Sequence, residues 1–160
     1  PFEESWFDVV CFCEVIEHLV NDPIQALMRV KKHLKKDGHL VLSTPNVARL
    51  ENVSKMLAGA NIYDPYSGYG AYGRHNREYN KHELSLLLDH MGFEIEEMFS
   101  ADVHPDGRHS FPALTKVEEL IKFRNQDLGQ YIFVRARNTR EANKKKPTWL
   151  YRSYPADELC

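Results

Sequence analysis

The sequence has few cysteines, no long apolar run and no marked excess of charge of either sign. Its 160 residues include 3 cysteines, 21 basic and 23 acidic side chains, and the formal net charge is −2. So small a charge gives no strong electrostatic attraction to nucleic acid or to a membrane surface. No apolar run approaches the roughly 20 residues that a membrane-spanning helix needs. These absences argue against a nucleic-acid partner and against membrane insertion.

The start of the sequence lacks the features of a secretory signal peptide. The first four residues, PFEE, provide neither the basic start nor the apolar centre of such a peptide, so we expect a cytoplasmic protein. They also lack an initiator methionine, from which we expect the sequence to begin inside a longer protein.

Two of the cysteines, Cys11 and Cys13, are two residues apart. On a strand they share one face and are poorly placed to form a disulfide with each other. We expect buried free thiols; a metal-binding or redox pair is the alternative, because C-x-C alone is a weak signal.

Apolar patterning in the first third predicts an α/β fold. Residues 6–13 form an apolar, β-branched run that is typical of a strand buried on both faces. A helix follows, which Asp22 begins and Gly38 ends, and residues 39–43 form a second strand. This strand–helix–strand unit favours a parallel sheet with a right-handed crossover.

The rest of the chain predicts further helices and strands. The capping-box pattern of Asn80 and Glu83 begins a helix whose buried face is leucine-rich and which Gly92 ends. Another helix is expected at 46–58, with Leu57 on its buried face. The remaining expected elements are a helix capped by Thr115 and running to about Phe123, and strands at 93–99 and 130–137.

Two segments have no regular pattern. Residues 59–74 hold four tyrosines, Tyr63, Tyr66, Tyr69 and Tyr72. They predict either an ordered surface loop anchored by its tyrosines or a lid over a substrate. Residues 138–160 are basic and aromatic, and we expect an extended arm that docks through Trp149 or stays mobile; a basic patch for an anionic partner is the alternative.

Candidate chemistry lies directly after the first strand, where α/β sheets bind ligands. Glu14, Glu17 and His18 follow that strand. If the turn is helical, Glu14 and His18 share a face. Two carboxylates and an imidazole that converge there can hold a divalent cation or orient a base. The alternative is a hydrogen-bonded pair of Glu17 and His18 that only fixes the turn.

Four segments in order carry a family resemblance. The stretch PFEESWFDVVCFCEVIEHL, the segment LKKDGHLVLSTPN at 34–46, the run RHNREY at 74–79 and the segment from Glu83 to Phe93 together resemble class I S-adenosylmethionine-dependent methyltransferases. The resemblance covers about residues 1–137. It implies a partial Rossmann-like α/β sheet, made of the family's strands four to seven with flanking helices, the last two strands antiparallel.

The sequence departs from this family in one respect. The glycine-rich loop after the family's first strand and the acidic residue that ends its second strand are absent. We therefore expect residues 1–137 to be the C-terminal part of a methyltransferase domain, followed by the arm at 138–160.

The resemblance also implies roles for individual residues. Cys13, Glu14 and Val15 would border S-adenosyl-L-methionine. A similar Glu-x-x-Glu-His turn is implicated in divalent-metal binding in ubiquinone-biosynthesis and small-RNA O-methyltransferases. The corresponding ligands of Mg²⁺ or another divalent cation here are Glu14, Glu17, His18 and His75. The catalytic candidates are His18, as a metal-free base, and His75, which with Tyr79 is also a candidate substrate contact.

The expected reaction is methyl transfer to an oxygen of a small-molecule or glycan-type acceptor, because tyrosine rings stack on flat or sugar-like groups. Two alternatives remain: a non-catalytic truncated module, and a metal-dependent enzyme acting on a ribose hydroxyl of nucleic acid. A nicotinamide-dependent dehydrogenase has no support from the Glu-x-x-Glu-His turn. The sequence does not indicate an oligomeric state.

Overall fold

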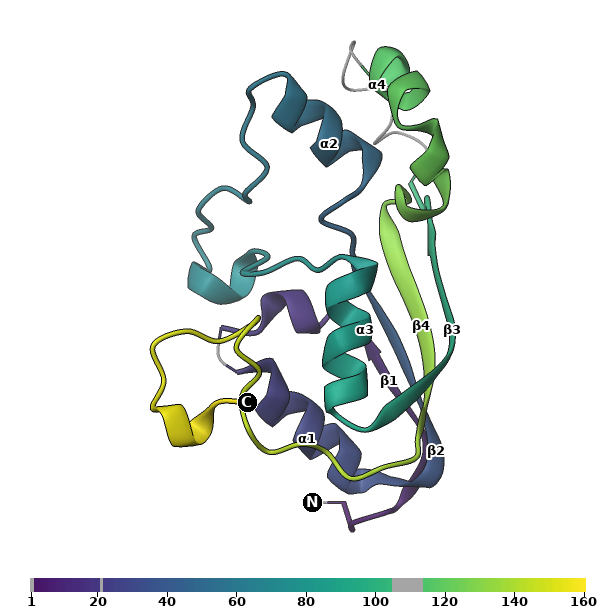
Figure 1. Ribbon diagram of the computed structural model, residues 1–160, viewed down its shortest axis with the longest axis vertical. Helices are drawn as coiled ribbons and strands as arrows, with labels where there is room; N and C mark the ends of the chain where they lie inside the picture. Colours follow the sequence, from purple (N-terminus) through teal and green to yellow (C-terminus); the bar gives the residue numbers. More distant parts are fainter. Residues whose placement is uncertain (1, 21, 105–113) are drawn as a thin grey trace.

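The protein is built around a four-stranded mixed sheet with strand order β1-β2-β4-β3 (Figure 1). The computed structural model describes residues 2–20, 22–104 and 114–160. The strands are β1 (Phe7–Cys13), β2 (Leu34–Pro45), β3 (Phe93–Ala101) and β4 (Tyr131–Asn138). β1 and β2 are parallel, whereas β4 runs antiparallel to both of its neighbours. The predicted α/β class and the antiparallel pairing of the last two strands are confirmed.

Two helices, α1 (Pro23–His33) and α3 (Lys81–His90), cover one face of the sheet (Figure 1). The side chain of Asp22 caps α1 by accepting a hydrogen bond from the amide of Ile24 at 2.9 Å. The core between these helices and the sheet consists mainly of aliphatic side chains. It includes Ile24, Leu27, Leu40, Leu42, Leu84, Leu87, Leu88, Ile132, Val134 and Ala136.

The expected end of the first helix at Gly38 was wrong. α1 ends at His33 and β2 begins at the next residue. A Cβ atom on Gly38 would lie 3.0 Å from the carbonyl oxygen of Asp8. The glycine is therefore needed for the close approach of β1 and β2 rather than for a helix end.

The helix α3 follows the sequence closely. Asn80 accepts a hydrogen bond from the amide of Glu83, and the Glu83 carboxylate accepts one from the amide of Asn80, so the predicted capping box is present. Gly92 follows the helix with a φ of 74°, which a glycine adopts without steric cost. A local pattern was sufficient to predict this element because its signals lie within 13 residues.

The first strand is more exposed than its sequence predicts. Val9 is 52% exposed, and Cys11 and Cys13 are exposed as well. The expectations of a strand buried on both faces and of buried thiols were therefore wrong. β1 is an edge strand of the sheet, and in the described part of the chain only its other face, with Val10 and Phe12, packs against the core.

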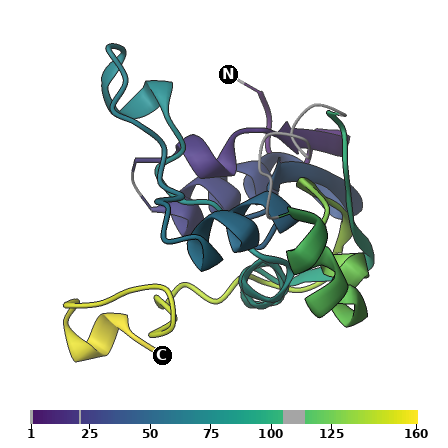
Figure 2. The same cartoon turned by 90° about the horizontal axis from the view of Figure 1, so that it is seen from above.

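The region after β2 also differs from expectation. The helix α2 (Leu50–Leu57) is shorter than predicted, and its buried positions include Asn52 and Ser54, whereas Leu57 is 66% exposed. Residues 59–74, with the short turn η2 (Gly70–Gly73), project away from the sheet (Figure 2). Their four tyrosines are between 78% and 92% exposed, so these side chains do not anchor the loop.

Within the described ranges, three further helical elements belong to the last third of the chain. They are α4 (Leu114–Leu120), η4 (Lys122–Asp127) and η5 (Ala156–Glu158). α4 begins at Leu114, so Thr115 lies inside this helix, and the Thr115 side chain, which was predicted to cap it, is not among the described side chains. In the described part of the chain, no helix is long and apolar enough to cross a membrane.

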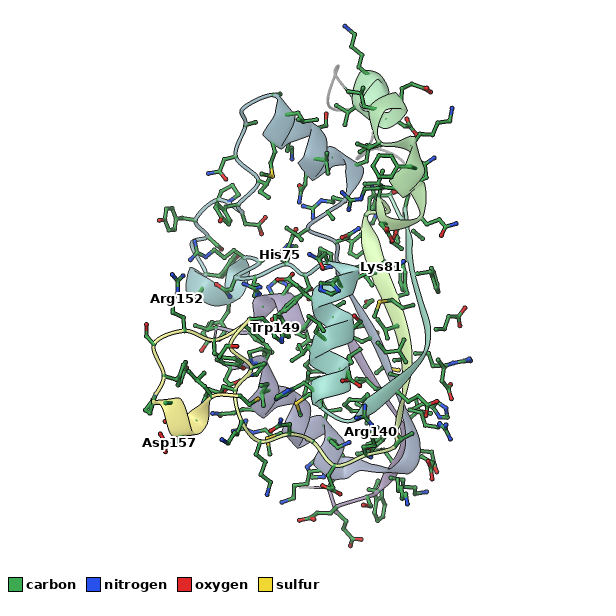
Figure 3. All side chains as sticks on the ribbon, in the orientation of Figure 1. His75, Lys81, Arg140, Trp149, Arg152 and Asp157 are labelled. Atoms are coloured by element: carbon green, nitrogen blue, oxygen red, sulfur yellow. The ribbon has the colours of Figure 1, made fainter. Side chains whose placement is uncertain are left out.

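The C-terminal arm packs back onto the domain. The Tyr151 hydroxyl donates a hydrogen bond to Asp22, and the tyrosine is 9% exposed. The amide of Asn143 donates to the carbonyl of His90 at the end of α3. We expected the arm either to dock through Trp149 or to stay mobile. Trp149, labelled in Figure 3, is 39% exposed, whereas the buried Tyr151 holds the arm to the cap of α1.

Candidate functional site

The site begins where β1 ends and the short turn η1 (Ile16–His18) starts. Glu14 has a φ of 55°, in the left-handed region that few residues other than glycine adopt. Its amide donates to the carbonyl of Ser43 at 2.9 Å, and its carboxylate accepts a hydrogen bond from the Ser43 hydroxyl at 2.7 Å. Glu14 has this left-handed backbone and precedes the helical turn, which starts at Ile16. Glu14 therefore does not share a helix face with His18.

Glu17 is a buried carboxylate with one unused oxygen. Its residue is 0% exposed, and its Oε2 accepts a hydrogen bond from the hydroxyl of Thr44 at 2.9 Å. Its Oε1 accepts no hydrogen bond in the described part of the chain and lies 3.7 Å from Nε2 of His18. Burial raises the pKa of Glu17, because the charged form loses its hydration. An unpaired buried carboxylate oxygen calls for a positively charged or proton-donating partner.

His18 and His75 are oriented so that the same ring nitrogen of each is free. Nδ1 of His18 lies 3.1 Å from the carbonyl oxygen of Arg74, which can only accept, so this nitrogen carries the proton. Nδ1 of His75 lies 2.8 Å from the Glu78 carboxylate and donates to it in the same way. In the neutral rings Nε2 then has a lone pair. The two rings meet edge to face with centroids 4.9 Å apart.

The surroundings of His75 come from three segments. Figure 3 shows the residue close to the start of α3. Its backbone amide donates to Asp64 of the tyrosine-rich loop at 2.9 Å. The segment directly after it is tied to η1, because the amides of Asn76 and Arg77 donate to the carbonyl of Glu17. His75 thus reaches η1 from a position 57 residues further along the chain.

Hydrogen bonding between Glu78 and His75 shifts the pKa values of the two groups in opposite directions. Burial would raise the pKa of Glu78, but hydrogen bonds from His75 and Arg49 hold the pKa of that carboxyl below its ordinary value. The hydrogen bond to Glu78 in turn raises the pKa of His75. Arg49 Nη1 lies 2.5 Å from Glu78 Oε2, and both side chains are largely buried.

Among the residues that the structure describes, two groups of side chains have the composition and spacing of a cation site. In each, ligand atoms lie within 4.8 Å of one another. The first group is Glu17, His18 and His75, and the second is Asp64, His75 and Glu78. The first contains three of the four ligands expected from the sequence, and Glu14 does not join it. Asp64 and Glu78 were not predicted, although Glu78 lies within the RHNREY motif, three residues after His75.

Comparison with known proteins decides the class of the molecule. Residues 2–98, more than half of the chain, match the family described as methyltransferase domain. The chain belongs to this family. It is a class I S-adenosylmethionine-dependent methyltransferase domain with a Rossmann-like fold. The family implies S-adenosyl-L-methionine as the methyl donor and some methyl acceptor.

Solved structures support the fold. The methyltransferase domain aligns with a Thermotoga maritima protein described as a possible histamine N-methyltransferase, with a TM-score of 0.54, 19% identity and 87% of this chain covered. It aligns with the methyltransferase solved together with the Trm112 activator of Haloferax volcanii at a TM-score of 0.53, with 18% identity over 88% of this chain. A Burkholderia thailandensis 1,6-didemethyltoxoflavin-N1-methyltransferase gives a TM-score of 0.51, with 18% identity over 88%.

The domain is shorter than these structural relatives. It spans 59%, 57% and 47% of the lengths of the Thermotoga, Haloferax and Burkholderia proteins, respectively. No curated protein matched the sequence. At these identities the likeness establishes the fold and leaves the acceptor of the methyltransferase domain unspecified.

The other predicted site residues divide into two groups. Cys13, Glu14 and Val15 are exposed at the carboxyl end of β1. Tyr79, expected as a substrate contact, is 2% exposed within the apolar core, and burial raises its pKa to about 12. Five of the other histidines, His33, His39, His82, His90 and His104, are partly or fully exposed, as expected of surface residues, and His109 lies outside the described residues.

Proposed function

We propose that this domain transfers a methyl group from S-adenosyl-L-methionine to a hydroxyl oxygen of a small or sugar-like acceptor. We propose further that Glu17, His18 and His75 bind a divalent cation that takes part in the transfer. The observation that carries this proposal is the buried, unpaired Oε1 of Glu17, close to two imidazoles whose Nδ1 atoms are already engaged.

The residues present fit a cation. A carboxylate oxygen and two neutral imidazole nitrogens are common ligands of divalent transition metals. Magnesium prefers oxygen ligands, so this donor set favours Mn²⁺, Co²⁺ or Zn²⁺ over Mg²⁺. When bound, such an ion lowers the pKa of an acceptor hydroxyl and withdraws charge from it. Glu17 would supply the negative charge that holds the ion, and the two imidazoles would fix its position.

In this proposal the methyl donor binds at the carboxyl end of β1. Cys13, Glu14 and Val15 would contact S-adenosyl-L-methionine through the exposed backbone at this point of the sheet. The reversed conformation of Glu14, held by Ser43, supports this assignment, because strained backbone at the carboxyl end of a strand is common at ligand sites.

A cavity next to His75 suits an acceptor. It measures about 200 Å³ and is bordered by residues at the ends of β2 and β4 and by the segment after β3. The lining includes Arg49, His75, Glu78, His104 and Tyr131. Its size suits a single ring, and its hydrogen-bonding side chains suit a hydroxylated one rather than an apolar one. The exposed tyrosines of residues 59–74 belong to the segment directly before His75 and would stack on further rings of a glycan.

The extent of the domain is also part of the proposal. We take residues 1–137 as the C-terminal, acceptor-side part of a methyltransferase domain, containing its strands four to seven, and residues 138–160 as an arm. The exposed edge of β1 and the 59% coverage of the Thermotoga protein support this assignment.

Calorimetric titration tests the cation site directly. The full chain is stripped with EDTA, dialysed and titrated with Mn²⁺, alongside Glu17→Gln and the matched control Glu14→Gln. We expect one Mn²⁺ to bind to the parent chain and to Glu14→Gln, and binding to be lost in Glu17→Gln. Equal binding by all three chains would contradict the assignment of Glu17, and no binding by any would refute the site.

Methyl transfer is the second readout. With radiolabelled S-adenosyl-L-methionine and a panel of hydroxylated acceptors, transfer should be abolished by EDTA and restored by Mn²⁺. Activity that survives chelation would favour His18 as a metal-free base. Absence of both cofactor binding and transfer would favour the non-catalytic module.

A further inference from the structure

The two carboxylates beside Nδ1 of His75 are unequal partners. Glu78 Oε1 lies 2.8 Å from this nitrogen, whereas Asp64 Oδ2 lies 3.7 Å from it. Asp64 Oδ2 already accepts a hydrogen bond from the backbone amide of His75 at 2.9 Å. Glu78 is therefore the side chain that accepts the ring proton of His75.

Glu78 is itself held in place from the other side. Its Oε2 accepts a hydrogen bond from Arg49 at 2.5 Å and lies 3.4 Å from the amide nitrogen of Asn52. Arg49 also donates to the carbonyl of Asn46 at 3.0 Å. Asn46 is fastened in turn to the carbonyls of Asp127 and Gly129 by its own amide group. The carboxylate thus connects His75 to the rigid end of β2.

We infer that Glu78 is the positioning residue that sets the tautomer of His75 and so keeps Nε2 of this ring unprotonated in the group with Glu17 and His18. A carboxylate that accepts from Nδ1 stabilises the Nδ1–H tautomer and leaves Nε2 free as a ligand. Without Glu78, the Nε2–H tautomer becomes accessible, and Nε2 then cannot bind a cation. The use of that lone pair by a metal rests on the function proposed above, but the choice of tautomer does not.

The arrangement of partners makes Glu78→Gln a sharp test. Arg49 can only donate, so the amide oxygen of the new glutamine must face it. The NH₂ group then faces Nδ1 of His75, and as a donor it requires a lone pair on that nitrogen. The substitution should therefore move the ring proton from Nδ1 to Nε2 with almost no change in side-chain volume.

Nitrogen-15 NMR of the histidine rings measures the tautomer in the full chain. The spectra are recorded in EDTA and in alkaline buffer, where both imidazoles are neutral. We expect His75 to be protonated on Nδ1 in the parent chain and in the control Asp64→Asn, and on Nε2 in Glu78→Gln. An unchanged His75 tautomer in Glu78→Gln would overturn the inference, as would a tautomer change produced by Asp64→Asn alone.

Mn²⁺ titration of the same three chains provides the second readout. Outer-shell partners of metal-ligating histidines typically change metal affinity by about 10- to 100-fold, so we expect a rise of that size in the Kd of Glu78→Gln. Asp64 is not among the proposed ligands, so Asp64→Asn should bind Mn²⁺ about as tightly as the parent chain. An equal loss in Asp64→Asn would place the ion in the group of Asp64, His75 and Glu78 and overturn the assignment of Glu78 as a positioning residue. If the parent chain bound no Mn²⁺, the cation proposal would fail, while the NMR spectra would still decide the role of Glu78. If Glu78→Gln bound Mn²⁺ as tightly as the parent chain, Glu78 would not position His75.

Discussion

The buried face of α3 is apolar, whereas the buried side chains at the carboxyl ends of β1 and β2 are polar. On α3, Leu84, Leu87 and Leu88 are all 0% exposed. At the strand ends the buried side chains are polar, and Glu17 and Thr44 are likewise 0% exposed. Burial of apolar surface stabilises a fold, whereas burial of a carboxylate costs free energy unless every oxygen is paired.

This contrast indicates that the polar strand ends are the less stable part of the domain. A buried polar side chain costs little folding free energy when its hydrogen bonds are made, as the Thr44 hydroxyl does by donating to Glu17. The unpaired Oε1 of Glu17 has no such compensation in the described residues. In the function proposed above, a cation at this oxygen would provide the missing compensation.

The largest effect is expected on the apolar side. Leu87→Ala should lower the free energy of unfolding by about 2 to 5 kcal/mol, because it removes a fully buried side chain and leaves a cavity. Chemical denaturation followed by circular dichroism measures the change. The matched control is Leu86→Ala on the same helix, where the side chain is 38% exposed and the loss should be much smaller. Equal losses would show that α3 does not anchor the core.

At the carboxyl ends of β1 and β2, removal of a buried charge should stabilise the fold. In EDTA, Glu17→Gln should raise the free energy of unfolding by about 1 to 3 kcal/mol, the usual penalty of an unsatisfied buried group. The amide removes the charge, keeps an oxygen for the Thr44 hydroxyl and offers a donor toward His18. Glu14→Gln, at an exposed residue, is the control and should change little. A destabilised Glu17→Gln would mean that this carboxylate supports the fold.

Most of the fold was predictable because its signals are local. Asp22, Asn80 and Gly92 mark helix ends through bonds to neighbours in the sequence, and these predictions are confirmed. Exposure was not predictable in the same way. The thiols of Cys11 and Cys13 are exposed, whereas Val10 and Phe12 on the opposite face of β1 pack against the core, and which face is covered is a tertiary property.

The site was predictable only in part, for a related reason. Glu17, His18 and His75 belong to motifs, and the fold brings them together. Glu14 belongs to the same motif, but its left-handed backbone turns the side chain toward Ser43. The pairing of Glu78 with Arg49 joins residues 29 apart, and no spacing rule indicates it.

The smallest predicted effect lies at the junction of the two regions. Asn80 caps α3 and follows directly on the segment from His75 to Tyr79. Asn80→Ala should lower the free energy of unfolding by about 1 kcal/mol, because the amide of Glu83 loses its partner. Ser85→Ala, which removes an exposed hydroxyl on the same helix, is the control and should have little effect.

A double variant then tests whether the two regions are independent. If the apolar layer and the polar strand ends are separate, the changes caused by Asn80→Ala and Glu17→Gln should add to within about 0.5 kcal/mol. A larger coupling energy in the denaturation curves would mean that the α3 cap and the buried carboxylate share one network. In that case the segment from His75 to Tyr79, which is bonded to the carbonyl of Glu17 through Asn76 and Arg77, would be the connection.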